Sequence, residues 1–355
     1  MLRFSEKSRR SELILRFIAA GRLVAVLSAC SLLLLSCASV PPSRPTTGWL
    51  DVLPPLSSDS IYVSVDVASS WSLLKALAEA GGNETGELER IIGNLNRVHA
   101  LIRLSPGESP AQAPELSLIA LGKLSPGSVA CQLNLDPSWQ RVMLERLPGR
   151  GFTSSHWSYR TYWRKEELQI AAPERGVLFL TGGVPAGAEA LLRRLHSPQA
   201  QPLPAQVRGA QETADMFFFI PDPAALATSS AAAPTAQGPG TLFQNLPIRQ
   251  GWISARRQVS STGIQTGDPK GYELEAVFLL DQVDNPRSVE MLLRLMLTLW
   301  LRKVRVEDPV EILKAVTFRA DSESARIESL FLEAGEIASF VTALLPETRG
   351  SGGRP

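Results

Sequence analysis

Cysteine is scarce in this sequence, and its distribution excludes two kinds of site. There are three cysteines in 355 residues. Cys30 and Cys37 lie in an apolar segment near the N-terminus, which leaves Cys131 for the rest of the chain. One cysteine cannot make a disulfide framework or a multi-cysteine zinc or iron–sulfur site. The body of the protein therefore has to fold without either.

Histidine is equally scarce, and its spacing gives no catalytic or metal-binding motif. His99, His156 and His196 are not spaced at i,i+4, and no H-E-x-x-H pattern occurs. Each is predicted to be a partly exposed structural residue. Ser72 and Lys75 match the S-x-x-K motif of penicillin-recognising serine enzymes, but the S-x-N and K-T-G elements are missing. We predict no catalytic residue, no metal, no cofactor and no enzymatic activity.

Neither sign of charge is in excess. The chain has 36 basic and 35 acidic residues. Its first 36 residues hold six of the basic and two of the acidic ones, so the remainder has 30 against 33. Without a basic surplus there is no strong field to attract nucleic acid or anionic headgroups. We therefore expect no nucleic-acid partner.

The apolar run at residues 23–35 is too short to cross a membrane comfortably. Its thirteen residues rise about 20 Å as a helix, whereas the hydrocarbon core is about 30 Å thick. Basic residues precede the run, and it ends at Leu34-Leu35-Ser36-Cys37. A basic start, a short apolar core and small residues before a cut site are typical of a secretory signal.

The end of this run resembles the lipobox of bacterial lipoproteins, in which the cysteine after the cleavage site carries the lipid. The resemblance implies a lipidated Cys37 and a body attached to a membrane of the cell envelope, in the periplasm or at the surface. Which membrane is left open. Cleavage before Cys30 is one alternative, and an uncleaved anchor is another. The prolines of residues 40–45 prevent a regular helix or strand ladder, which favours a tether.

The body is predicted to be an α+β protein of two tandem domains, each with a mostly antiparallel sheet packed by helices. Strand patterns at residues 59–66 and 215–222 both begin and end with aspartate. Hairpins, a helix, further strands and a closing helix follow in the same order in each half. An old duplication is the favoured explanation, and chance matching of two α+β patterns is the alternative.

Composition predicts where these parts begin and end. Segments rich in Pro, Ala, Ser and Gln without an apolar period are predicted to be connectors. The predicted parts are a signal peptide (1–36), a Pro-rich tether (37–58), a first domain (59–196), a linker (197–213), a second domain (214–346) with a flexible insertion (222–245), and a disordered tail (347–355).

Aromatic residues are concentrated at residues 156–164. Strand alternation places Trp157, Tyr159 and Trp163 on one face. The opposite face is a candidate binding surface, with an aromatic ring among cations suited to a sugar or a partner's side chain. Its residues are His156, Arg160, Tyr162 and Arg164. A purely structural cross-strand ladder on an edge strand is the alternative.

Residues 286–303 are predicted to form a helix with an unusually wide apolar arc. Arg287, Glu290, Arg294, Thr298 and Arg302 make one narrow polar stripe, and nearly all other positions are Leu, Met, Val or Trp. We expect most of this arc to be buried within the protein, with Arg294 at the rim. A candidate apolar pocket is formed by Leu292, Leu295, Met296 and Leu299.

Two functions are consistent with these patterns. The first is a non-enzymatic envelope lipoprotein that binds or scaffolds another envelope component, most simply a protein. The second is a carrier of a lipid or other apolar ligand on the 286–303 helix. A closed interdomain core at this helix would favour the first, and a cavity would favour the second.

Overall fold

The computed structural model describes residues 46–80, 93–103, 114–144, 160–201, 203–223, 248–258, 271–281, 283–304 and 309–344. Helices and antiparallel strands combine in these ranges, which confirms the predicted α+β class. The strands are β1 (Ser60–Asp66), β2 (Leu95–Arg103), β3 (Glu115–Gly122), β4 (Gln140–Met143), β5 (Thr161–Lys165), β6 (Leu168–Ala171), β7 (Val177–Gly182), β8 (Met216–Ile220), β9 (Ile248–Arg257), β10 (Gly271–Leu280), β11 (Thr317–Ala320) and β12 (Ser324–Glu333). The helices are the 3-10 helix η1 (Thr46–Val52) and the α-helices α2 (Trp71–Ala80), α4 (Pro126–Leu135), α5 (Gly187–His196), α6 (Ala205–Thr213), α9 (Pro286–Val304), α10 (Pro309–Ala315) and α11 (Ala334–Leu344).

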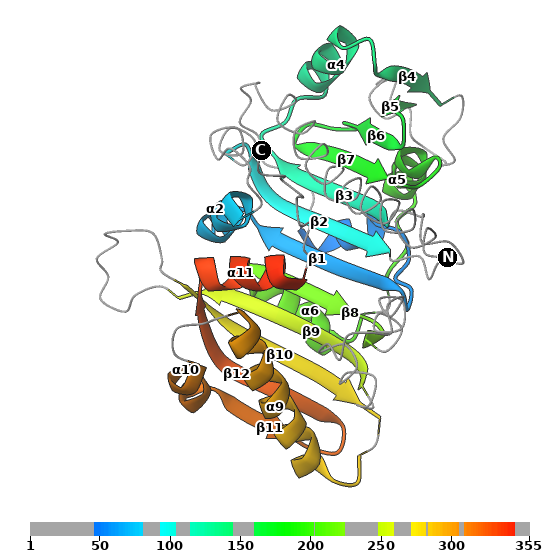
Figure 1. The fold of residues 1–355 in the computed structure, drawn as a ribbon. Helices are drawn as coiled ribbons and strands as arrows, with labels where there is room; N and C mark the ends of the chain where they lie inside the picture. Colours follow the sequence, from blue (N-terminus) through cyan, green and yellow to red (C-terminus); the bar gives the residue numbers. More distant parts are fainter. Residues whose placement is uncertain are drawn as a thin grey trace, which may run out of the picture.

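One continuous sheet of twelve strands runs through the described part of the molecule (Figure 1). The strand order is β11-β12-β10-β9-β8-β1-β2-β3-β7-β6-β5-β4, and every neighbouring pair is antiparallel. β1 and β8 pair at the centre, where Tyr62 lies opposite Phe219 and Val65 lies opposite Met216. The first strand of one predicted domain is thus hydrogen-bonded to the first strand of the other.

The two halves of the chain share a strand order but are not separate bodies. Counted outward from the centre, the first half runs β1-β2-β3-β7 and the second runs β8-β9-β10-β12. One apolar cluster contains Tyr62 and Leu101 from the first half together with Phe217, Trp252 and Val277 from the second. The expected boundary between two independent domains is therefore absent from the sheet and from its core.

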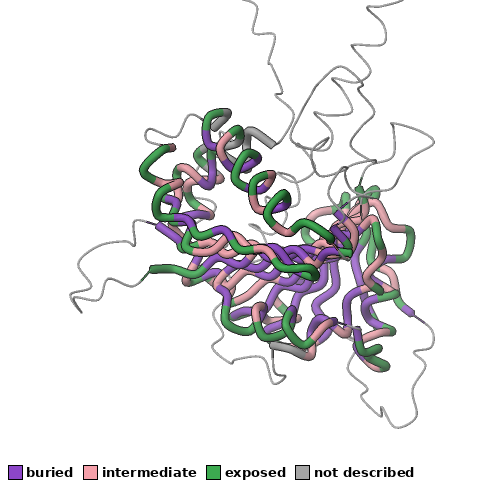
Figure 2. The backbone as a smooth tube through the Cα atoms, turned by 90° about the horizontal axis from the view of Figure 1, so that it is seen from below, coloured by how far each residue is buried: buried purple, intermediate pink, exposed green. Residues whose placement is uncertain are grey.

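Helices cover both faces of this sheet, so strand residues of either parity can be buried (Figures 1 and 2). η1, α5 and α6 pack on one face, around Tyr62 and Phe217. The opposite face carries α2, α9, α10 and α11 over the second half and the centre, and α4 over the first half. Successive residues of a strand point to opposite faces, so Phe217 and Met216 enter different clusters.

The segment predicted to be the end of the tether is part of the core. η1 lies within residues 37–58, and its Trp49 and Val52 are fully buried together with Leu53. These apolar side chains fill the face that α5 also covers. The folded body therefore begins at or before Thr46, and the predicted boundary at residue 59 is wrong.

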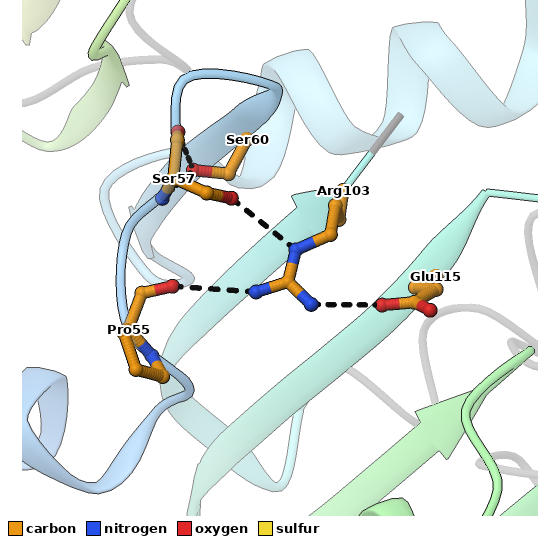
Figure 3. A network of polar contacts seen from close by, with 5 residues as sticks. All are labelled: Pro55, Ser57, Ser60, Arg103 and Glu115. Carbon is orange, nitrogen blue, oxygen red and sulfur yellow. Dashed lines mark hydrogen bonds and ion pairs between the residues drawn. The ribbon is translucent and has the colours of Figure 1, made fainter. Parts of the chain in front are cut away.

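A polar network ties the chain after η1 to the sheet (Figure 3). The Arg103 guanidinium donates to Ser57 Oγ at 3.2 Å and to the Pro55 carbonyl at 3.4 Å. It also pairs with Glu115 Oε2 at 3.0 Å. Ser60 Oγ donates to the Ser57 carbonyl at 2.6 Å. Arg103 lies on β2 and Glu115 on β3, so the entering chain is fixed across three strands.

The predicted linker at residues 197–213 is also structural. Its second half is α6, whose Val207 and Gln211 are buried against the sheet. Ahead of the helix, the buried Gln201 side chain donates to the carbonyls of Leu53 and Pro54 at 3.2 and 3.1 Å. The predicted linker has few apolar residues, so the sequence pattern did not reveal α6, a helix that buries only one line of side chains. Residues 224–245 of the predicted insertion, the signal segment with Cys37, and the 347–355 tail lie outside the described residues.

Candidate functional site

Helix α9 divides its apolar residues between the core and the solvent. It begins at Pro286, whose fixed φ suits a first helical turn. Its inner face packs against β11, β12, α10 and α11. The buried residues on that face follow spacings of three or four and are Val289, Leu293, Met296, Leu297 and Leu301. This face supplies the fully buried residues that the structure describes on the helix.

Three large apolar side chains remain exposed on the outer face of α9. Met291 is 72% exposed, Leu295 48% and Leu299 45%. Their four-residue spacing places them in one line along the helix, and we name this line the α9 stripe. No described element covers it. The prediction that most of the apolar arc is buried on three sides is therefore wrong for these residues, because the sheet and its neighbouring helices contact only the inner face.

Arginines border the α9 stripe on one side. Arg287, Arg294 and Arg302 are exposed. Arg287 lies four residues before Met291 and continues the line of the stripe, while helix geometry places Arg294 and Arg302 on its flank toward β11. The Arg294 guanidinium lies 5.0 Å from the centre of the Phe318 ring on β11, which is cation–π distance. Its predicted place at the rim of the packed face agrees with this contact. The arrangement suits a partner that is apolar along its middle and acidic along one border.

The four residues of the predicted apolar pocket do not gather round one cavity. Met296 is 9% exposed and belongs to the core. Leu292 is partly buried against the same core. Leu295 and Leu299 point outward in the α9 stripe. The prediction of a pocket is wrong here, and a surface is present instead.

The predicted aromatic binding face on β5 is largely buried. Tyr162 is 6% exposed and lies in the core cluster under α5, and Trp163 is buried on the opposite face. Trp163 Nε1 donates to Asn134 Oδ1 at 2.9 Å. The alternation was right, but β5 is an inner strand between β4 and β6, and both faces are covered. Arg160 and Arg164 are exposed, but the Tyr162 ring that the predicted binding face requires is not exposed beside them. His156 lies outside the described residues.

His99 was predicted to be partly exposed, and that prediction is wrong. It is fully buried at the centre of the sheet, where Tyr62 OH lies 2.8 Å from His99 Nδ1. Gln211 Nε2 donates to Tyr62 OH at 2.7 Å. With Gln211 donating to its oxygen, Tyr62 can donate its own proton to Nδ1 of the Nε2-protonated tautomer, and Nε2 has no hydrogen-bond partner among the described residues. The sequence held no local sign of this cluster, since its residues come from β1, β2 and α6.

The electrostatics of this cluster indicate a structural role. Burial, with the nearby Arg97 charge, lowers the pKa of His99 to about 3. Burial also raises the pKa of Tyr62 above its usual value. Both groups are therefore neutral near pH 7, and neither is matched to proton transfer there.

The remaining sequence signals take part in local structure. Ser72 Oγ lies 3.0 Å from Tyr272 OH of β10, and Tyr272 OH also donates to the Ser69 carbonyl at 3.1 Å. Asp66 Oδ1 accepts the Ser69 N–H at 3.0 Å, in the turn that leads into α2. The two Tyr272 bonds join the first half to the second.

None of the helices in the described ranges is long and apolar enough to span a bilayer. No group of three or more His, Cys, Asp or Glu side chains in the same ranges is arranged to hold a metal ion.

Comparison with known proteins shows a shared fold. No family model and no curated protein matches the sequence. Crystal form III of TP0453 superposes with a TM-score of 0.55 and 13% identity, over 87% of this chain and 100% of that chain. Crystal form IV of TP0453 gives 0.54 and 14%, over 86% and 97%. At this identity the likeness concerns the fold alone, and the chain is similar to TP0453 in the course of its backbone over nearly the whole of that protein.

Proposed function

We propose that this protein is a non-enzymatic lipoprotein of the cell envelope that binds another envelope component through the α9 stripe. A lipid on Cys37 would hold it at a membrane. The observation that supports binding is the α9 stripe itself. Burying a large apolar side chain gains about 1.5–3 kcal/mol relative to leaving it in water, and contiguous exposed apolar residues mark interaction sites.

The chemistry of the stripe favours a protein as the partner. A groove-forming protein surface can accept side chains at i, i+4 and i+8 of a helix. Acidic side chains on one border of that groove would complement Arg294 and Arg302. An enclosed lipid carrier has less support, because Leu295 and Leu299 face solvent while Met296 is in the core.

We also infer that the two halves arose by duplication within one sheet. The shared order β1-β2-β3-β7 and β8-β9-β10-β12 supports this origin. In each half a helix, α4 or α9, follows the third strand, and a helix, α5 or α11, follows the last. Under this proposal α9 is the counterpart of α4, and its extra length and exposed stripe are features that the second half acquired.

Photo-crosslinking in intact cells tests the binding proposal. A photoreactive phenylalanine analogue replaces Leu295 in the full-length chain, and the matched control carries it at Leu135, which is 78% exposed on α4. We expect one protein to be crosslinked from position 295 and not from 135. The same crosslink should disappear when Leu299→Asp is added.

Other crosslinking results would contradict the proposal. Equal yields at both positions would mean that the stripe is not selective. Crosslinks from position 295 to lipid alone would replace the protein partner with an acyl chain, which is the carrier function.

Lipidation is tested by Cys37→Ala. We expect the variant to be released from membranes or to accumulate as the unprocessed precursor, because the lipid attachment site is lost. Membrane fractionation and labelling with a fatty-acid analogue measure this, with Cys30→Ala as the control that remains processed and membrane-bound. Normal acylation of the Cys37→Ala protein would move the attachment site to Cys30.

A further inference from the structure

A polar hollow of about 210 Å³ lies on the sheet face opposite α9. Ser254 and Trp252 are two residues apart on β9 and share a face, and Trp252 packs in the cluster under α5 and α6. The hollow is lined by Ser254, Arg256, Glu273, Glu275, Glu328 and Ser329. We name it the β10 hollow, after the strand that supplies two of its carboxylates.

A β-bulge shapes the β10 hollow. The pairing of β10 with β12 shifts between Leu274 and Ala276, so Glu275 faces two residues, Glu328 and Ser329. Ser329 has φ of 59°, in the left-handed region that non-glycine residues rarely adopt. The bulge brings Glu328 beside Glu275, two like charges on neighbouring strands.

Part of the charge and hydrogen-bonding capacity in the hollow is already used. Glu328 pairs with Arg319 at 3.4 Å. Arg256, cross-strand from Glu273, donates to Thr213 Oγ1 at 2.9 Å. Neither Glu273 nor Glu275 has an ion-pair or hydrogen-bond partner for its carboxylate among the described residues.

A buried hydroxyl group at the floor of the hollow also lacks a partner. Ser254 is 1% exposed and lies directly cross-strand from Glu275. Its Oγ makes no hydrogen bond to any residue that the structure describes. The hydroxyl lines the hollow, so its donor and its acceptor are both available to a group bound there.

We propose that the β10 hollow binds a short aliphatic diamine. A primary ammonium has three donors and no acceptor, which matches the Glu275 and Glu328 carboxylates and the Ser254 hydroxyl. Glu273 and Glu275 are two residues apart on one strand face, about 7 Å along the strand, and a four-carbon diamine has a similar separation between its nitrogens. The volume of the hollow fits such a chain. In the described ranges no group of three or more His, Cys, Asp or Glu side chains is arranged to hold a metal ion instead.

Calorimetric titration of the purified full-length chain with 1,4-diaminobutane tests the proposal. We expect saturable binding that Glu275→Gln weakens at least tenfold, since a charge-assisted hydrogen bond is lost. Ser254→Ala should weaken diamine binding several-fold. The unliganded protein should stay folded, because the Ser254 hydroxyl makes no hydrogen bond to a described residue that the change would break. Glu79→Gln, an equal charge change at an exposed site on α2, is the matched control and should bind as the parent does. The monoamine n-butylamine should bind more weakly than the diamine.

Several results would overturn the proposal. One is the absence of saturable heat. A second is equal weakening by Glu275→Gln and Glu79→Gln, or equal binding of tetramethylammonium, which would show general attraction of cations. A third is Glu275-dependent binding of a lysine-rich peptide without binding of the diamine, which would assign the hollow to a protein segment. Thermal melting of each variant separates loss of binding from loss of fold.

Discussion

Tyr62, His99 and Gln211 join three separate elements through two hydrogen bonds inside an apolar core. Because burial leaves these groups without water, a missing partner costs more than the bond itself contributes. At the scale of residues, the cluster is therefore where small chemical changes should have large effects.

Tyr62→Phe removes the hydroxyl that bridges His99 and Gln211. We expect the free energy of unfolding to fall by about 1–3 kcal/mol, because two buried groups lose their partner. Urea denaturation measures this. Tyr162→Phe is the matched control and should cost less than about 0.5 kcal/mol, since no described residue bonds its hydroxyl. Equal costs would mean that the bridge contributes nothing specific.

The lowered pKa of His99 predicts a pH dependence of stability. With a pKa of about 3 in the folded protein and about 6.5 when unfolded, only the unfolded chain binds this proton between those values. Stability should therefore decrease as pH falls from about 6.5 toward 3, by up to about 1.4 kcal/mol per unit. His99→Gln should be less stable at pH 7 but should lose less stability on acidification to pH 5. Urea denaturation at both pH values measures the difference. Identical pH dependence in the parent and His99→Gln would contradict the prediction.

Sequence patterns predicted residue orientation better than residue burial. Alternation correctly placed Tyr162 and Trp163 on opposite faces of their strand. It could not show that both faces are covered, because the covering helices come from distant segments. The same limit applies to His99, whose partner Tyr62 lies 37 residues before it in the chain. Gln211, which bonds Tyr62, lies 112 residues after His99.

At the scale of elements, the sequence pattern predicted the position of α9 correctly but not which of its apolar residues are exposed. The spacing predicted residues 286–303, and the helix runs to Val304. With apolar residues on most of its circumference, the pattern did not identify which line meets the sheet. That choice is made by β11, β12, α10 and α11.

A pair of substitutions two positions apart on α9 tests this assignment. Leu293→Asp should destabilise the protein by about 4 kcal/mol or more, because Leu293 is 1% exposed in the core. Leu295→Asp should cost less than about 1 kcal/mol, because Leu295 is exposed on the α9 stripe. Thermal melting followed by circular dichroism measures both. If Leu295→Asp also unfolds the protein, the stripe is part of the core after all.

The whole molecule is organised round the central β1–β8 pair. The order of strands along the chain, the hairpins and the α+β class were predictable from local patterns. The joining of the two halves into one sheet was not, because pairing between strands more than 150 residues apart leaves no local periodicity. The segments that form η1 and α6 contain few apolar residues, and they were predicted to be connectors for the same reason. The residues that they pack against lie far away in the sequence.

A shared sheet and core predict that the chain unfolds as one unit. Calorimetry of the full-length protein should show a single transition, with calorimetric and van't Hoff enthalpies in agreement. Residues 214–346 expressed alone should fail to fold, because Phe217, Phe219 and Trp252 would lose their cover from η1, α5 and α6. Two resolved transitions, or a folded isolated half, would restore the picture of independent domains.

The early start of η1 limits how far the body can stand from a membrane. Under the proposed lipidation of Cys37, eight residues lie between Cys37 and Thr46, a span of at most about 30 Å. Had the chain remained a connector to residue 58, the span would have been about 70 Å. The shorter distance is comparable to the thickness of the bilayer core. The partner of the α9 stripe must therefore come within one protein diameter of the lipid surface, and a component that stays farther away is out of range.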